Sequence, residues 1–558
     1  MKKYFLLCIG LAIAVGITAA PRSMQEAQLV AVHYFATHSS AMRAPLHSHA
    51  LQHVWTAPQP NGEPALYVFN RGEAEGFIIV SADDNTRSIL AYSDTGYFSL
   101  TELPDNARAW LEEYVRAIHH AAQTSDAAYH AMEHTTKTYT PVEPLCHTLW
   151  DQWDPYNRLC PLINGTRTLT GCTATAAAQI MKKHQYPTQG TGSHSYKWYR
   201  TQTDYEQLSA DFGSTTYQWE LMFDTLQYNT SEESRDAVAT LMYHCGVAGE
   251  MNYGLYETGG SGTTSNIMLL GMVDHFGYDK GIRTICKDYM SEEAFLDSIH
   301  ADLTNGLPVF FSAKTIQNGG HAFICDGMDA NGLVHINWGW GGRSDAYFQV
   351  SALAPKTQGA GGSTTNHAYV VDVTAFTHIQ PNQNGQALYD FTCANITLDA
   401  ERVKRDERPI IRMDTITNRS IHTWTGNLVW VMYKNDKYYK VVYRVNSKIR
   451  GGYYYSNVEA TPSFANIPAG DYTIVPAMVL DGRSSDFIPI QVRGKDAYHI
   501  PVRITADSVY LGETALRLQA IDAVYESSTP QCIKSIRDGQ LLIERNGVVY
   551  DALGRKIR

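Results

Sequence analysis

Three kinds of metal-binding pattern are absent from this sequence of 558 residues. No two of its cysteines stand at CxxC spacing, and neither an HExxH motif nor an acidic cluster at metal-ligand spacing occurs. Structural zinc sites and zinc peptidases need such patterns. We therefore predict no metal and no other cofactor.

Basic blocks and long internal apolar runs are missing as well. The net charge is −11, and no Lys/Arg cluster is present to neutralise phosphates, which argues against nucleic acid as a partner. After the N-terminus, no segment is long and apolar enough to span a membrane. Residues 1–20 do contain two lysines, a short apolar run and then small residues, the order of a secretory signal peptide. We predict a protein without transmembrane segments, secreted or displayed at the cell surface.

A chain of this length exceeds a single hydrophobic core. Residues 21–144 combine strand-like runs with one amphipathic helical pattern and end in a polar stretch, about 124–144, which we expect to be an exposed linker. Residues 145–376 start with helical patterns (172–184, 231–247, 264–276 and 291–305) and continue with short Gly-rich strands. Residues 377–505 alternate like an antiparallel β-sandwich, and residues 506–558 form a C-terminal tail.

Cys172 is the strongest candidate for chemistry. It follows Gly171 and opens the alanine-rich run CTATAAAQIMKKH, which predicts a helix ending in basic residues. The positive end of a helix lowers the pKa of a thiol, so a cysteine there can be a thiolate nucleophile at neutral pH. A structural cysteine packed beneath the helix is the alternative. If Cys172 is the nucleophile, an odd number of cysteines remains after the signal, and we expect several to be buried small hydrophobes.

A histidine downstream favours the nucleophile. His321 follows two glycines and precedes the apolar run AFIC, and as a general base it would take the thiol proton and later protonate the leaving amine. His335, in VHINWGWGG, is the rival. Position alone favours His321 only modestly.

Three more residues fit a thiol enzyme. Asn337 and Trp338 come after both histidines, and such enzymes use a third group to orient the imidazole and an indole to shield that hydrogen bond. A Gly/Trp-rich turn that merely packs is an equal alternative. Gln152, in LWDQWDPYN, could supply the second donor of an oxyanion hole beside the Cys172 N–H, although a surface or capping glutamine is common.

Taken together, these motifs resemble the streptopain family of bacterial cysteine peptidases. The resemblance covers roughly residues 145–376 and rests on WDQWDPYN, TGCTATAAAQIMKKHQYP, MNYG with GGSG, and GGHAFICDG with HINWGWGG. It implies that Cys172 is the nucleophile, His321 the base and Gln152 the oxyanion donor. Trp338 would stand where papain-like enzymes carry their orienting Asn, with Asn337 as the alternative. Ser261 and Gly320 match family positions that touch the substrate backbone.

The same family implies a fold and a regulation. The expected fold is a papain-like α+β catalytic core, although the papain signature CGSCW is absent, with a small α+β propeptide before it and an all-β, sandwich-like domain after it. The run GFIIVSADD and its neighbours resemble the family's propeptide, which would cover the active site and misalign His321 until the linker is cut. The end of the chain resembles the C-terminal sorting tails of some exported proteins.

The predicted function is that of a secreted cysteine endopeptidase made as a zymogen. Its partners would be protein or peptide substrates and its own propeptide as an intramolecular inhibitor. Two alternatives remain open: a thiol transferase or amidase, and an adhesin or host-binding protein in which the β-domain carries the function.

Overall fold

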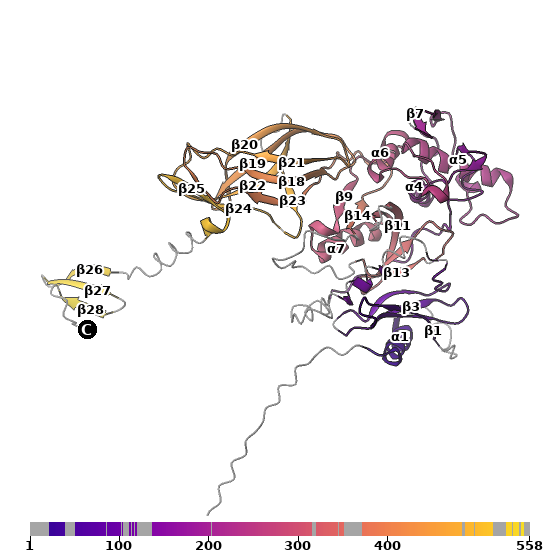
Figure 1. Ribbon diagram of the computed structural model, residues 1–558, viewed down its shortest axis with the longest axis horizontal. Coiled ribbons are helices and arrows are strands. Elements are labelled where there is room, and N and C mark those ends of the chain that lie inside the picture. The colour runs from indigo at the N-terminus through magenta and orange to yellow at the C-terminus, as the bar shows by residue number, and fades with distance from the viewer. Residues whose placement is uncertain are drawn as a thin grey trace, which may run out of the picture. The chain divides into compact units, whose positions relative to one another are not determined.

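The computed structural model describes most of the chain: residues 22–38, 51–103 (without 85 and 102), 111–119 (without 113 and 117), 137–314 (without 202), 320–350 (without 344), 371–516 (without 482–485 and 496), and the strands at 532–537, 540–545 and 548–551. The predicted signal peptide and most of the predicted linker lie outside the described residues. The chain divides into two compact units, Met1–Leu388 with Ser420–His422, and Tyr389–Arg419 with Thr423–Arg558 (Figure 1).

One antiparallel sheet of ten strands runs through the first unit. The strand β4 (Ile89–Ser93) pairs with β13 (Ala346–Phe348), so strands of the N-terminal region and of the 145–376 region belong to the same sheet. In order across the sheet the strands are β1 (Gln52–Pro58), β2 (Pro64–Asn70), β3 (Phe77–Ser81), β4, β13, β12 (Val334–Asn337), β11 (Gly320–Met328), β10 (Val309–Lys314), β14 (Val371–Thr377) and β9 (Arg283–Cys286).

The strands β2, β3 and β4 are buried on both faces, whereas the edge strand β1 is mostly exposed. Along β2, Leu66 and Val68 belong to one hydrophobic core and Tyr67 and Phe69 to another, as the two-residue period of a strand requires. The helix α1 (Met24–His38) contributes to the second core. The first core receives the apolar face predicted from the sequence, which is helical where described: Leu111, Tyr114 and Ile118.

Helices cover both faces of the catalytic half of the sheet. The helix α4 (Cys172–His184) packs against β11, and its alanines allow close contact with α5 (Glu232–Ala248) and α6 (Ser265–Phe276). The helix α7 (Glu292–Thr304) contacts β10, β11 and β14 and contributes its apolar side to the core on the opposite face. Short elements complete this half: β5 (Leu162–Ile163), β6 (Thr166–Arg167), β7 (Ser193–Tyr199), β8 (Tyr205–Asp211), η2 (Trp219–Leu221), η3 (Tyr256–Thr258) and η4 (Lys287–Tyr289).

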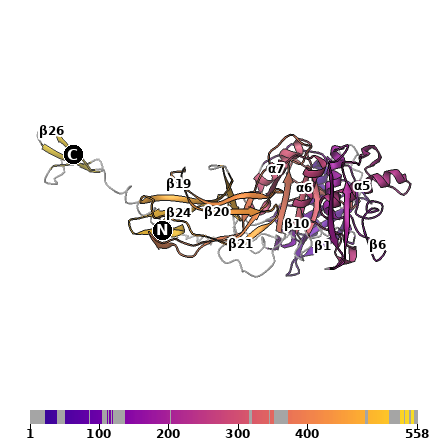
Figure 2. The same cartoon turned by 90° about the horizontal axis from the view of Figure 1, so that it is seen from above.

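The strands of the second unit form two layers, which Figure 2 shows nearly edge-on. Trp424 and Trp430 are fully buried in its core. Its strands are β15 (Phe391–Cys393), β16 (Ile396–Leu398), β17 (Arg402–Lys404), β18 (Ile411–Asn418), β19 (Trp424–Lys434), β20 (Lys437–Ile449), β21 (Tyr454–Ala460), β22 (Gly470–Leu480), β23 (Phe487–Val492), β24 (Ile500–Ile504) and β25 (Ser508–Leu511). The tail contributes β26 (Cys532–Arg537), β27 (Gln540–Arg545) and β28 (Val548–Asp551).

The end of the predicted linker is largely exposed but is joined to the catalytic core at a few points. Tyr139 is buried, its N–H donates to the carbonyl of Ala330, and Val142 pairs with Met328. The Lys137 ammonium lies 2.6 Å from the Asp297 carboxylate of α7. Most of residues 137–144 are exposed, as their polar composition suggested. The backbone hydrogen bonds of Tyr139 and Val142 nevertheless hold this stretch against the catalytic core, which composition does not reveal.

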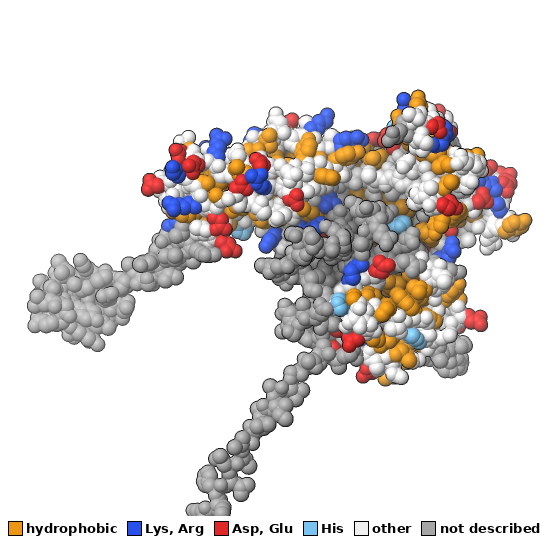
Figure 3. Space-filling view, viewed as in Figure 1, with side chains coloured by type: hydrophobic (Ala, Val, Ile, Leu, Met, Phe, Trp, Pro, Cys, Tyr) orange, Lys and Arg blue, Asp and Glu red, His pale blue; other side chains and the backbone are white. Residues whose placement is uncertain are grey.

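Surface and cysteines complete the description. In the space-filling view, Lys and Arg side chains alternate with Asp and Glu over the visible face and form no single basic patch there (Figure 3). Within the described part of the chain, no helix has the length and apolarity needed to cross a membrane. The seven cysteines described with side chains are all free, and all except Cys172 are buried.

Candidate active site

Cys172 is the first residue of α4, at an N-terminus that has no side-chain cap. The preceding Gly171 has φ 88°, and a Cβ built there would lie 2.7 Å from the Met251 side chain, so only glycine fits this turn. By contrast, α5, α6 and α7 are capped by Ser231, Thr264 and Ser291. The open N-terminus of α4 therefore directs free backbone N–H groups and the positive end of the helix at the thiol.

His321 lies on the neighbouring strand β11 and is partly exposed, like Cys172. The N–H of Ala322 donates to Cys172 Sγ at 3.3 Å. Burial raises the pKa of the Cys172 thiol, but a hydrogen bond with His321, the charge of that imidazole and the N–H groups of Ala322 and Thr173 lower it further, and the net shift is downward. The arrangement favours a thiolate–imidazolium pair.

His335 is not placed to be the base. Its Nδ1 lies 2.6 Å from Oδ1 of the buried Asp326, and its ring packs against Tyr347. Burial lowers the pKa of His335, but the carboxylate of Asp326, with those of Asp345 and Glu143, raises it by more. His335 is thus a half-buried ion-pair partner of Asp326 on β12, whereas His321 lies beside the thiol, and its role as the base stays a prediction.

The thiol opens into a cleft of about 370 Å³. Four predicted site residues line it together: Cys172, His321, Gln152 and Ser261. Its other lining residues are Asp151, Trp153, Leu169, Tyr256, Glu257, Gly259, Gly260 and Trp340. Neither Trp338 nor Asn337 is among them.

Gln152 and Ser261 are held by their backbones and neighbours. The Gln152 carbonyl accepts from the Thr170 N–H, and its side-chain amide makes no hydrogen bond with any described residue, which leaves it available in the cleft. The Ser261 hydroxyl donates to the Leu169 carbonyl at 2.7 Å and accepts from the Gly254 N–H at 2.9 Å. Ser261 therefore fixes the cleft loop with its side chain, and only its backbone remains for a ligand. Gly320 begins β11 and pairs with Lys314.

Asn337 does not orient His321. Its amide oxygen accepts from Gln179 Nε2 at 3.2 Å and from the Gly339 N–H at 3.0 Å, and its Nδ2 donates to the Thr148 carbonyl at 2.9 Å. The Thr148 hydroxyl completes this hydrogen-bond network by donating to Gln179 Oε1 at 2.7 Å. This fully buried network ties α4, the segment leading to Gln152 and the turn after β12 together, so Asn337 acts in the framework of the cleft.

Trp338 is fully buried and packs against Phe323 and Phe348 at ring-centroid distances of 4.8 and 5.3 Å. Phe323 and His321 share one face of β11, because side chains alternate along a strand. Trp340, the second indole of the turn, is the one that lines the cleft, and its buried Nε1 has no hydrogen-bond partner among the described atoms. The sequence analysis missed Trp340, although the WGW spacing was the available signal.

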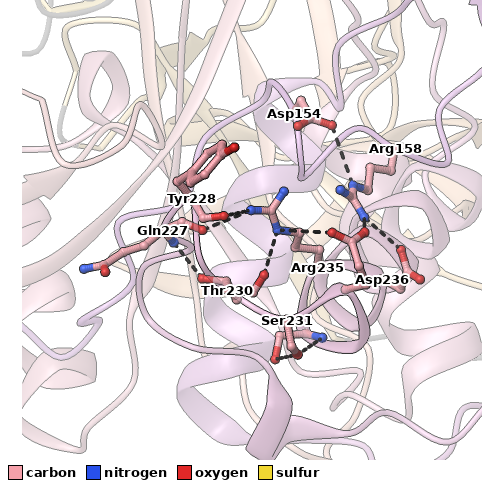
Figure 4. Close-up of polar contacts among 10 residues, drawn as sticks. Asp154, Arg158, Gln227, Tyr228, Thr230, Ser231, Arg235 and Asp236 are labelled. Atoms are coloured by element: carbon pink, nitrogen blue, oxygen red, sulfur yellow. Dashed lines mark hydrogen bonds and ion pairs between the residues drawn. The ribbon is translucent and has the colours of Figure 1, made fainter.

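The segment that carries Trp153 is joined to α5 by polar contacts (Figure 4). Arg158 lies within 4 Å of the carboxylates of Asp154, Glu232 and Asp236. Arg235, one turn into α5, donates to the carbonyls of Thr230, Gln227 and Tyr228. The Arg158 pairs with Glu232 and Asp236 join the segment from Trp153 to Arg158 to α5, and the Arg235 bonds hold the loop that precedes α5.

The N-terminal region joins the catalytic sheet at a distance from His321. Its strand β4 joins the sheet at β13, two strands away from β11. β4 therefore does not pair with the strand of His321, and the expected misalignment of His321 stays a prediction.

Family models match two parts of the chain: residues 150–348 match the Peptidase C10 family, and residues 19–118 match the Spi protease inhibitor. The thiol protease/hemagglutinin PrtT of Porphyromonas gingivalis is 31% identical over 403 residues, 69% of this chain and 45% of PrtT, so this chain spans less than half the length of that relative. Streptopain of Streptococcus pyogenes is 31% identical over 317 residues, 53% of this chain and 76% of streptopain.

Two solved structures are also similar. A prointerpain A fragment of Prevotella intermedia is 30% identical, with 60% of this chain and 99% of that chain covered and a TM-score of 0.49. Active interpain A of the same organism is 35% identical, with 44% and 97% covered and a TM-score of 0.39. The family matches and the streptopain identity confirm the predicted family, its papain-like fold class and its propeptide. The chain belongs to the peptidase C10 family, the cysteine endopeptidases of the streptopain type, and carries an inhibitory Spi domain.

Proposed function

We propose that this protein is an exported zymogen that hydrolyses peptide bonds of proteins through a thioester on Cys172. The observation that carries the proposal is the Cys172 thiol, hydrogen-bonded to His321 and the Ala322 N–H at the uncapped N-terminus of α4. Its pKa is lowered there, as a sulfur nucleophile requires.

The chemistry would run in two halves. The Cys172 thiolate attacks the scissile carbonyl carbon, and the C–N bond breaks as the His321 imidazolium gives its proton to the leaving amine. Water, deprotonated by His321, then attacks the thioester and releases the acid. In both halves the tetrahedral oxyanion would be bound by the Cys172 N–H and the unpartnered side-chain amide of Gln152.

Three further residues would assist. The indole of Trp338, packed on Phe323 along the face of β11 that carries His321, would shield the imidazole from water. The backbones of Ser261 and Gly320 would pair with an extended substrate on the two sides of the thiol, since the Ser261 hydroxyl is already engaged.

Maturation would cut the chain before Lys137. Residues 137–146 are bound to the catalytic core, with the Cys146 N–H donating to the Asp326 carboxylate at 2.9 Å. A cut within this bound stretch would require it to unfold locally first. The region 124–136 therefore supplies the sites, and the new N-terminus would stay docked.

The first test is casein hydrolysis under reducing conditions by wild-type protein and by Cys172→Ala, with the chain followed on a gel. Cys146→Ala is the matched control, because it removes a buried thiol from the same domain. We expect activity and linker cleavage in the wild type and in the control, and neither in Cys172→Ala. Normal trimming of Cys172→Ala would contradict self-processing. A wild type that stays inert after an added protease cuts the linker would contradict the enzymatic proposal.

An added amine donor separates the hydrolase from the transferase. If the thioester is resolved by water, mass spectrometry finds a free carboxylate at the new end, whereas a transferase would give the amide of the donor.

A second role is favoured by one observation in the β-unit. PrtT, a relative of this chain, is named a hemagglutinin as well as a thiol protease. Here the strands β20 and β21 and their connection expose large aromatic side chains: Tyr438, Tyr439, Tyr453, Tyr454 and Tyr455. Agglutination of erythrocytes by Cys172→Ala protein would support a binding function independent of proteolysis, and its absence would leave the peptidase alone.

A further inference from the structure

An aromatic wall lies on one side of the cleft. Trp153 and Tyr256 meet with their ring centroids 5.7 Å apart, and 44% and 56% of their surfaces are exposed. Both line the cavity that contains Cys172. Large rings left this exposed inside a cleft offer apolar area that a bound side chain would cover.

The wall belongs to the side of the cleft that carries the proposed oxyanion donor. Trp153 follows Gln152 directly, whereas Tyr256 and Glu257 form the short helix η3 just before Gly259 and Gly260. His321 and Trp340 come from the sheet side of the cleft. A substrate residue whose carbonyl oxygen points at Gln152 would therefore have Trp153 among its neighbours in the cleft.

One carboxylate of the cleft is uncompensated. Asp151 accepts the Gln152 N–H and lies 3.5 Å from the Arg343 guanidinium. Glu257 lines the same cavity and forms no ion pair or hydrogen bond with any described residue. The subsite therefore combines two ring faces with a free negative charge.

The wall is also preorganised. The contacts of Arg158 with Glu232 and Asp236 join the end of the segment 153–158 to α5, and its contact with Asp154 closes the segment on itself (Figure 4). A subsite whose walls are already fixed loses less conformational entropy when a ligand orders it, so its contacts contribute more fully to binding.

We propose that Trp153, Tyr256 and Glu257 form a subsite for a cationic side chain, arginine or lysine, in the substrate residue whose carbonyl is attacked. The inference rests on the proposed function of Cys172. The methylene stem of such a side chain would cover the rings, its cation would lie over their faces, and its charge would pair with Glu257. A neutral apolar residue would gain the first contact only, and an acidic residue would be repelled.

The test uses full-length protein after linker cleavage and a set of fluorogenic peptides. The peptides differ only at the residue before the scissile bond: Arg, Lys, norleucine or Glu. We expect kcat/KM to be at least about tenfold higher for Arg than for norleucine, and Glu257→Gln to reduce that ratio about tenfold. The matched control is Glu220→Gln, an exposed carboxylate of the same domain outside the cleft, which should leave the ratio unchanged.

A charge-reversal variant tests the role of Glu257 even if Glu257→Gln has little effect. Glu257→Lys should invert the preference so that the Glu peptide becomes a better substrate than the Arg peptide. An Arg-to-norleucine ratio that stays the same in Glu257→Gln and Glu257→Lys overturns the subsite, even though casein is still cleaved and the proposed function stands. Loss of all peptide and casein cleavage in wild-type protein would instead contradict the function itself.

Discussion

Replacing Asn337 with alanine should lower both stability and activity, because it breaks the buried hydrogen-bond network around the cleft. The change leaves three buried groups without partners: the Thr148 carbonyl, Gln179 Nε2 and the Gly339 N–H. An unsatisfied buried polar group costs about 1–3 kcal/mol, so the sum for three groups is roughly 3–9 kcal/mol unless water enters the space. The loss of side-chain volume adds to this, since Asn337 is 2% exposed.

Hydrogen exchange of α4 amides measures the loss in this domain separately from the β-unit. It should be run in Cys172→Ala protein, which would not digest itself. In the active protein, kcat should fall at least tenfold, because the Asn337 hydrogen-bond network joins the helix of Cys172, the segment before Gln152 and the turn that presents Trp340. Tyr217→Phe is the control, since it removes a buried hydrogen bond of 2.9 Å to His244 from the same domain. A stability loss below about 1 kcal/mol, or a kcat equal to that of the control, would refute the reasoning.

Four other changes test separate features. Gly171→Ala places a Cβ 2.7 Å from Met251 at φ 88° and should lower activity by more than tenfold, measured by casein hydrolysis; wild-type activity would contradict the tight turn. Iodoacetamide should alkylate Cys172 well below pH 8 and leave Cys146 unmodified, because burial raises the pKa of Cys146 whereas the net shift of Cys172 is downward, and mass spectrometry reads the difference. Burial raises the pKa of Asp345 to about 7, so between about pH 4 and 7 the folded state binds a proton that the unfolded state has lost. The stability of the folded state should therefore fall as the pH rises through this range. Asp345→Asn should flatten that pH dependence in thermal unfolding, and an unchanged slope would contradict the prediction. Arg158→Ala should raise KM several-fold with less than about 1 kcal/mol of stability lost, whereas Arg200→Ala, which breaks an exposed pair on the β7–β8 hairpin, should leave KM as it is.

Periodic patterns predicted the helices of the catalytic half well. The expected ranges 172–184, 231–247, 264–276 and 291–305 differ from α4, α5, α6 and α7 by no more than one residue at each end. Ser and Thr caps mark three of these starts, and Gly171 marks the fourth. Local sequence suffices here because a helix closes its hydrogen bonds within itself.

The site was predictable where a residue sits on such an element. Cys172 at a helix start and His321 at a strand start are brought together as expected, because α4 packs on β11. The turn after β12 was not predictable in the same way. Gly339 has φ 72° and Gly341 has φ 67°, so the backbone leaves the strand and the two-residue period no longer tells which indole faces the cleft. Trp338 went into the core and Trp340 into the cleft.

Long-range pairing was the other gap. Nothing local in the sequence says that residues 137–144 lie along β11, or that β4 continues the catalytic sheet. Both depend on backbone hydrogen bonds between segments far apart in the chain. Composition favoured an exposed linker because polar residues are compatible with either arrangement.

The junction between β4 and β13 bears on how inhibition ends. Only two residue pairs join these strands, Tyr347 with Tyr92 and Phe348 with Ala91. While the connecting chain is whole, the N-terminal domain is held at an effective concentration in the millimolar range, which favours re-forming this short ladder within the same molecule. Once the chain is cut, the released domain can diffuse away, and the fraction that stays bound falls as the protein is diluted. A single cleavage thus converts an intramolecular equilibrium into a bimolecular one, and the release of the active enzyme depends on protein concentration.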